Sequence, residues 1–99
     1  MSDTAVQIQI SGRVQGVSYR AWLEQLADTL GLSGWVRNRH DGWVEAVLQG
    51  PAAAVEAALS LMERGPPDSR VDDVAVRPAE REEIALIQDA GGFAVLPDL

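Results

Sequence analysis

The sequence predicts a single α+β domain over residues 1–99, in which two helices cover one face of a mostly antiparallel sheet. Two observations carry this prediction. The spacing of apolar residues alternates along the chain between a period of two and a period of about 3.6, which is the pattern of strands and helices in turn. Turn residues at Gly31, Gly50-Pro51 and Gly65-Pro66-Pro67 separate these segments, and no linker or repeat divides the chain. With 46% hydrophobic residues, a chain of this length has enough apolar surface for one core.

The first unit is a strand followed by a helix. Residues 5–11 alternate between aliphatic and polar side chains, which predicts a half-buried strand. Residues 20–30 change to a helical period, with apolar side chains along one side. Gly31 then supplies a natural C-terminal stop.

A hairpin and a second helix come next. Residues 34–38 and 43–49 read as two strands, and the Asp41-Gly42 pair between them is a strong hairpin signal. Pro51 suits the start of a helix over residues 52–63, which the glycine and prolines at 65–67 end.

The last third of the chain is less regular. A strand is predicted from Val71 to Arg77, and Pro78 either stops it or marks it as an edge strand. Residues 84–87 read as a short strand or an irregular segment. Gly91-Gly92 then precedes a short terminal strand over residues 93–96, which Pro97 closes.

This order, βαββαβ with a short extra C-terminal strand, indicates the ferredoxin-like sandwich. Two strand–helix–strand units with right-handed crossovers place both helices on the same face of the sheet. The fold hosts many functions, so it does not by itself select one.

Composition excludes several classes of function. The chain has no Cys, so disulfides, thiolate metal sites and cysteine nucleophiles are excluded. No apolar run approaches the roughly 20 residues of a membrane span, and Met1 to Thr4 do not resemble a signal peptide. We therefore expect a cytoplasmic protein without a membrane partner. The net charge of −7 argues against a nucleic acid partner.

Charge is unevenly distributed along the chain. Residues 1–40 carry four Arg against three acids, whereas residues 41–99 carry four Arg against twelve acids. The second half is either simply a solvated acidic surface, or a scaffold for an anion site in the first half.

The stretch from Gly12 to Arg20, GRVQGVSYR, is the strongest candidate for that anion site. It lies between a predicted strand and a predicted helix. Glycines permit a tight turn and a close approach to the main chain, and the amides at a helix N-terminus attract phosphate. Arg20 adds a planar cation that suits phosphate oxygens. The stretch matches neither a Walker loop nor a dinucleotide-binding fingerprint.

Asn38 is the second candidate. It ends a predicted strand just before a tight turn, where Asn commonly satisfies nearby backbone groups. Alternatively, its amide accepts a hydrogen bond from a water molecule and donates one to a phosphate.

Taken together, GRVQGVSYR over residues 12–20 and GWVRNRHDGWVEA over residues 34–46 resemble the two signatures of the acylphosphatase family. Their spacing matches, and the likeness continues through Gly50-Pro51, residues 69–71 and residues 92–95. Residues 78–91 and the end of the chain after the last strand, LPDL, depart from the family pattern.

The resemblance implies a ferredoxin-like enzyme that hydrolyses acyl phosphates to a carboxylate and inorganic phosphate without a metal or cofactor. We expect a monomer, because nothing in the sequence suggests an obligate partner. It implies that Arg20 binds the phosphoryl group and that Asn38 holds the attacking water. It also implies that backbone amides of the loop cradle the phosphoryl oxygens, and these belong to Gln15, Gly16, Val17, Ser18, Tyr19 and Arg20.

Other residues receive structural or surface roles. Ser18 has no neighbouring base to activate it, so we expect a backbone contribution and no covalent role. His40 is expected to be exposed, and Arg37 and Arg39 to lie on the strand face opposite Asn38. Packing roles are expected for Tyr19 and the three Trp, and solvated charge for Asp72-Asp73 and Glu82-Glu83. Arg13 either raises the local electrostatic potential or is merely exposed.

Two alternatives to the enzyme remain at this point. One is a non-catalytic module on the same fold that binds an anion or a partner. The other is an RNA-binding ferredoxin-like domain, which the acidic charge and the lack of an aromatic RNA-binding signature disfavour.

Overall fold

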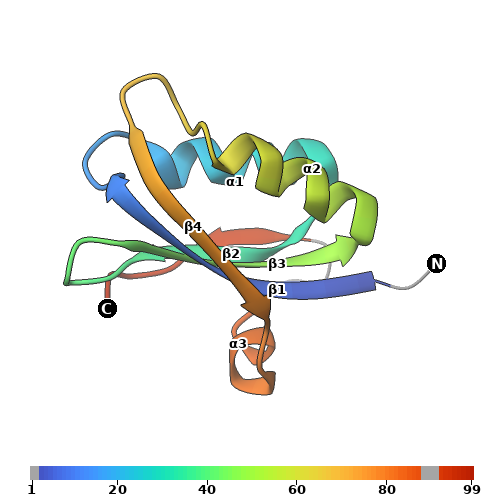
Figure 1. Cartoon of the computed structure of the whole chain (residues 1–99). Coiled ribbons are helices and arrows are strands. Elements are labelled where there is room, and N and C mark those ends of the chain that lie inside the picture. The colour runs from blue at the N-terminus through green and yellow to red at the C-terminus, as the bar shows by residue number, and fades with distance from the viewer. Residues whose placement is uncertain (1–2, 88–91) are drawn as a thin grey trace.

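The computed structural model of the chain describes residues 3–87 and 92–99. It contains an open sheet with two long helices packed on one face and a short helix below the other face (Figure 1). In chain order the elements are β1 (Asp3–Arg13), α1 (Tyr19–Leu30), β2 (Ser33–Asn38), β3 (Val44–Pro51), α2 (Ala52–Met62), β4 (Arg70–Pro78), α3 (Arg81–Ala85) and β5 (Phe93–Val95).

The sheet has the strand order β4-β1-β3-β2-β5. Neighbouring strands are antiparallel except β2 and β5, which run parallel. This is the expected ferredoxin-like βαββαβ arrangement with the extra terminal strand added beside β2. Pro78 ends β4, which is an edge strand, so the prediction for this proline is confirmed.

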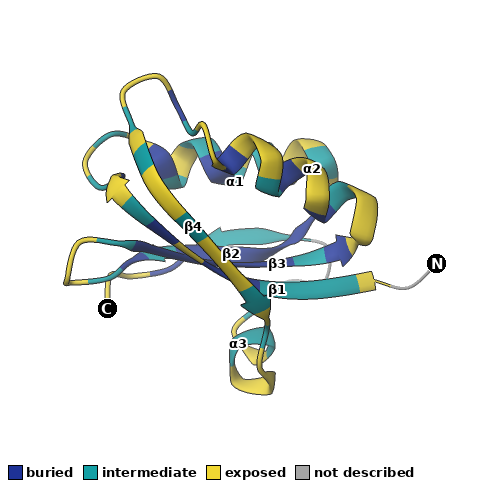
Figure 2. Ribbon diagram, in the orientation of Figure 1, coloured by how far each residue is buried: buried dark blue, intermediate teal, exposed yellow. Residues whose placement is uncertain are grey.

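The main core lies between the sheet and the two long helices. Alternate residues of the central strands face α1 and α2, so Ile8, Ile10, Val36, Ala46 and Leu48 are all fully buried. Figure 2 shows this buried band along β1, β2 and β3, with exposed residues along β4. The hydrophobic alternation of residues 5–11 therefore assigned the correct face of β1 to the core.

A second, smaller core lies on the opposite face of the sheet. It contains the buried residues Trp35, Val47 and Leu96, and the Trp35 indole N–H donates to the Glu83 carbonyl oxygen at 2.8 Å. The segment around α3 covers this face and supplies the acceptor that a buried indole N–H needs. This segment therefore covers part of the sheet face opposite α1 and α2.

Residues 84–87, predicted as a short strand or an irregular segment, form no strand: residues 84 and 85 belong to a helix, and residues 86 and 87 are irregular. Residues 81–85 form α3, and a reciprocal capping box between Glu80 and Glu83 begins it. Residues 88–91, including the expected Gly91 turn, and Met1 and Ser2 lie outside the described residues. Across the described ranges 3–87 and 92–99, no helix has the length and apolar character needed to cross a membrane.

The two stretches predicted to form the site meet at the edge of the sheet where β1 and β2 both terminate. The β1–α1 loop leaves the sheet here, and the β2–β3 turn projects beside it (Figure 1). The last residues of the chain reach the same edge, since the Leu99 amide donates to the Asn38 carbonyl oxygen at 3.0 Å. Segments distant in the sequence therefore meet at one end of the sheet.

Candidate active site

The loop between β1 and α1 has an unusual backbone conformation. Ser18 occupies the N-cap position of α1 in the left-handed region, with φ 66° and ψ 21°, and its side chain makes no capping hydrogen bond. Gly16 also has a positive φ of 74°. A non-glycine residue in this region is uncommon and marks a constrained backbone. The constraint bends the chain into a tight curve directly before the helix, whose first amides lack intrahelical partners.

The two glycines of the stretch from Gly12 to Arg20 have different roles, since Gly12 still belongs to β1 and Gly16 to the loop. A Cβ atom on Gly16 would meet nothing within 4 Å, so this position faces open space. A Cβ atom on Gly12 would lie 2.2 Å from the Arg70 carbonyl oxygen. Gly12 is therefore required for the close approach of β4, and the sequence-based idea that both glycines open the loop to an anion applies to Gly16 only.

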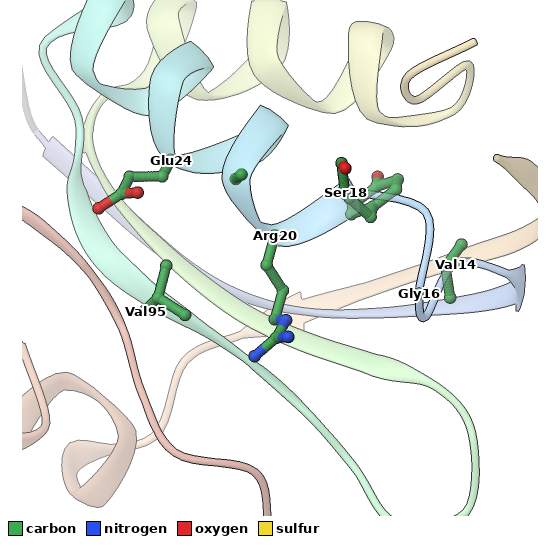
Figure 3. Close-up of a pocket in the computed structure, with 8 residues that line it drawn as sticks. Val14, Gly16, Ser18, Arg20, Glu24 and Val95 are labelled. Carbon is green, nitrogen blue, oxygen red and sulfur yellow. The ribbon is translucent and has the colours of Figure 1, made fainter. Parts of the chain in front are cut away.

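A cavity of about 390 Å³ lies under the start of α1. Gly16, Ser18, Tyr19 and Arg20, which belong to the predicted anion loop, line one part of it. Figure 3 shows the Arg20 side chain descending from the helix start toward the sheet, between the loop and the Glu24–Val95 end of the cavity. A cavity of this size accommodates a small anionic ligand.

Arg20 is partly exposed and already has a carboxylate neighbour. Its Nη1 lies 3.2 Å from Asp98 Oδ1, and the two side chains are 37% and 62% exposed. An exposed ion pair of this kind is weak and exchangeable. The guanidinium therefore remains able to bind another anion.

Tyr19 packs beneath the loop, as predicted. Its ring is fully buried, and its hydroxyl donates to the Met62 carbonyl oxygen at 2.8 Å, which links the start of α1 to the end of α2. Burial raises the pKa of Tyr19 far above its ordinary value. Tyr19 thus acts as a neutral support for the loop.

Asn38 is the last residue of β2 and lies on the helix-facing side of the strand, in the same row as Val36. Only 8% of it is exposed, yet its Oδ1 has no hydrogen-bond partner among the described residues. Buried polar atoms are nearly always paired, so such an acceptor needs an explanation. Asn38 does not itself line the cavity under α1.

The Gln15 side chain connects the loop to the strand end that carries Asn38. Its Nε2 donates to the carbonyl oxygens of Arg39, at 2.7 Å, and Trp43, at 2.9 Å. The sequence predicted only a backbone role for Gln15 and did not reveal these side-chain hydrogen bonds. The available signal was a polar residue inside a tight loop, but its partners are 24 and 28 residues away in the chain.

Arg37 and Arg39 lie on the face of the sheet opposite Asn38, which confirms the prediction. Both donate to Glu45 Oε1, at 2.8 Å and 3.2 Å, and they stack on Trp35 and Trp43 respectively. Glu45 is buried and also accepts from Gln7. These charges therefore stabilise the hairpin and face away from the cavity.

The remaining candidates lie outside the cavity. His40 is exposed, as predicted, and its Nδ1 lies 3.2 Å from the Leu99 carbonyl oxygen. Glu83, expected to be solvated, instead pairs with Arg77 and is only 15% exposed. Within residues 3–87 and 92–99, no group of three His, Asp or Glu side chains is placed to hold a metal ion.

Comparison with known proteins identifies the family. The acylphosphatase family model matches residues 6–93. The chain is 48% identical over 97 residues to an acylphosphatase of Bradyrhizobium diazoefficiens, covering 98% of both chains. It is 51% identical over 92 residues to one of Rhodospirillum rubrum, covering 93% of this chain and 94% of the relative. The crystal structure of acylphosphatase from Bacillus subtilis superposes with a TM-score of 0.81 at 33% identity, covering 93% of this chain and 97% of that one.

The two stretches that suggested the family from sequence, residues 12–20 and 34–46, fall inside the matched region. They also form the two sides of the edge described above. The chain belongs to the acylphosphatase family.

Proposed function

We propose that Arg20, Asn38 and the amides of the loop from Gln15 to Arg20 carry out the acylphosphatase reaction in this protein. The family activity is hydrolysis of an acyl phosphate to a carboxylate and inorganic phosphate. The observation that supports this division of roles is the buried, unpaired Oδ1 of Asn38 at the sheet edge that also carries the loop.

In the proposed complex, the phosphoryl group lies against the loop and Arg20. The first amides of α1 and the loop amides donate to its oxygens, while the guanidinium balances their charge. Gly16 keeps this face open, since a Cβ there would meet no neighbour. Binding by positioning and charge is the main requirement of phosphoryl transfer.

The attacking water is held by Asn38. Its Oδ1 accepts a hydrogen bond from the water, which aims the water oxygen at phosphorus. The new P–O bond forms as the bond from phosphorus to the acyl oxygen breaks, and the carboxylate leaves with that electron pair. Both water protons end on the phosphate product. Because a carboxylate is a good leaving group, no strong acid is required.

Gln15 is a positioning residue in this scheme. By binding the Arg39 and Trp43 carbonyl oxygens, it fixes the distance between the loop and the strand end that carries Asn38. Precise placement of a nucleophile relative to the reacting group accounts for a large share of many rate enhancements.

The test is hydrolysis of benzoyl phosphate in the presence of EDTA. We expect wild-type turnover to persist with the chelator, because the proposed chemistry uses no metal. Arg20→Ala and Asn38→Ala should each lower kcat by about 100-fold or more, the size of a lost transition-state contact. Circular dichroism identifies variants that fail to fold, and Asn38→Asp supplies a near-isosteric second variant that should also be impaired.

A matched control is His40→Ala, which removes an exposed side chain from the same turn and should retain activity. Normal turnover in Asn38→Ala would disprove the water-holding role. A folded wild type that binds phosphate but does not hydrolyse benzoyl phosphate would instead indicate a non-catalytic anion-binding module.

We also propose that residues 1–99 act as one domain and as a cytoplasmic monomer without a nucleic acid partner or cofactor. The net charge of −7 supports the absence of a nucleic acid partner. The monomeric state is checked by sedimentation equilibrium, and the location by cell fractionation.

A further inference from the structure

The cavity under α1 extends beyond the part that the phosphoryl group needs. At one end are Gly16 and Ser18 of the loop, and at the other are Glu24 of α1 and Val95 of β5. Figure 3 shows Arg20 between these two ends. If the phosphoryl group occupies the loop and Arg20, the acyl group is left with the end lined by Val95 and Glu24.

Glu24 gives that end its charge. It lies four residues after Arg20 on α1, so the two side chains share one face of the helix. Figure 3 shows its carboxylate on the same side of α1 as the Arg20 guanidinium. None of the ion pairs formed among residues 3–87 and 92–99 involves Glu24, and Arg20 pairs with Asp98 instead.

The other walls of this end offer no positive charge. Ala21 and Val95 are apolar, and Arg20 is the sole cation among the residues that line the described cavity. An acyl group that extends past Arg20 therefore meets aliphatic surface and then an uncompensated carboxylate. Two like charges at close range repel, and an opposite charge is attracted.

We propose that Glu24 determines acyl selectivity, so that the enzyme prefers acyl phosphates with neutral or cationic acyl groups over those with anionic ones. The proposal rests on the proposed placement of the phosphoryl group at the loop and Arg20. It names a substrate class and a residue that the reaction chemistry itself does not require.

The experiment uses three substrates of similar size: benzoyl phosphate, para-carboxybenzoyl phosphate and para-(trimethylammonio)benzoyl phosphate. The quaternary ammonium is not a nucleophile, so the cationic substrate does not react with its own acyl phosphate group. kcat/KM is measured for each with the wild type, Glu24→Gln and Glu56→Gln. Comparing the substrate ratios between proteins cancels the effect of each substituent on intrinsic reactivity.

We expect the cationic-to-anionic ratio of kcat/KM to fall by about fivefold in Glu24→Gln, as one partly solvated charge interaction is removed. Glu56→Gln removes an exposed charge of the same sign from α2, outside the cavity, and should keep the wild-type ratio. Added salt should shrink the wild-type ratio more than that of Glu24→Gln, since the variant lacks one of the charges that salt screens.

The outcomes separate this proposal from the function it rests on. If benzoyl phosphate is hydrolysed but Glu24→Gln shows the wild-type ratio, Glu24 does not determine selectivity. This proposal then fails, while the proposed function stands. An equal change in Glu56→Gln would also overturn it, because the effect would then come from net charge. If the folded wild type hydrolyses none of the three substrates, the proposed function itself fails.

Discussion

Arg20, which lines the cavity, forms an ion pair with Asp98, with Nη1 and Oδ1 3.2 Å apart. The two residues are 78 positions apart in the chain. The pair places a carboxylate beside the guanidinium proposed to bind the phosphoryl group. Asp98 therefore lies where a phosphoryl oxygen would compete with it.

Asp98→Asn should strengthen substrate binding. The substitution removes the competing charge, so we expect the KM for benzoyl phosphate to fall by about threefold, in line with an exposed ion pair worth a fraction of 1 kcal/mol. The inhibition constant of inorganic phosphate should fall in parallel, and kcat should change little. Steady-state kinetics at low and high salt measure this. A higher KM would mean that Asp98 orients Arg20 and does not compete with substrate.

Gln15→Ala should separate the loop from the turn that follows Asn38. The Arg39 and Trp43 carbonyl oxygens lose their side-chain donor but keep a backbone donor, from the Gly42 and Arg39 amides respectively. At about 0.5–1.5 kcal/mol for each lost hydrogen bond, we expect a loss of about 1–3 kcal/mol in unfolding free energy. kcat should fall more than phosphate affinity, because the water-holding strand moves relative to the loop. Urea unfolding and phosphate inhibition measure the two effects. Gln9→Ala, an exposed glutamine of β1, is the matched control. Equal losses in both variants would contradict a specific role for Gln15.

Ser18→Ala should retain most of the activity. Ser18 contributes its backbone conformation, and its hydroxyl caps nothing. A covalent nucleophile would instead lose on the order of a million-fold in kcat when removed. Since alanine at φ 66° is as strained as serine, Ser18→Gly serves as a second variant that fits this conformation. A loss in both variants as deep as that of Arg20→Ala would establish a chemical role for the hydroxyl.

The Arg77–Glu83 pair should make the unfolding free energy depend on pH in the acid range. The Arg77 side chain holds the pKa of Glu83 below its ordinary value of 4.5, and the Glu80 amide adds to this against the effect of burial. Because the folded-state pKa is lowered, the pair stabilises the protein above pH 4.5 and this contribution is lost as the pH falls through the folded-state pKa.

Glu83→Gln should therefore flatten the dependence of the unfolding free energy on pH below that value. The change should stay within about 1 kcal/mol, because the pair is partly exposed. Glu82→Gln alters the neighbouring, exposed carboxylate and should leave the dependence as in the wild type. Thermal unfolding across the acid range measures both, and identical curves for Glu83→Gln and the wild type would refute the assignment.

Local patterns in the sequence determined most of the fold. Alternation along residues 5–11 and the helical period of residues 20–30 each depend on which side of one element is buried, and this is visible in consecutive residues. Gly31 adopts the left-handed conformation that ends α1, as its position predicted. The family and its two signatures were also recognisable, because residues 12–20 and 34–46 are each continuous.

Tertiary structure alone decided the contacts between distant segments. The Gln15 bonds to the β2–β3 turn, the Arg20–Asp98 pair and the Glu83 carbonyl beneath Trp35 all join residues far apart in the chain. No local propensity encodes such pairs, since they arise only when the sheet order β4-β1-β3-β2-β5 brings strand ends together. The sequence determined which residues were available for the site, and the packing of the sheet decided which of them meet.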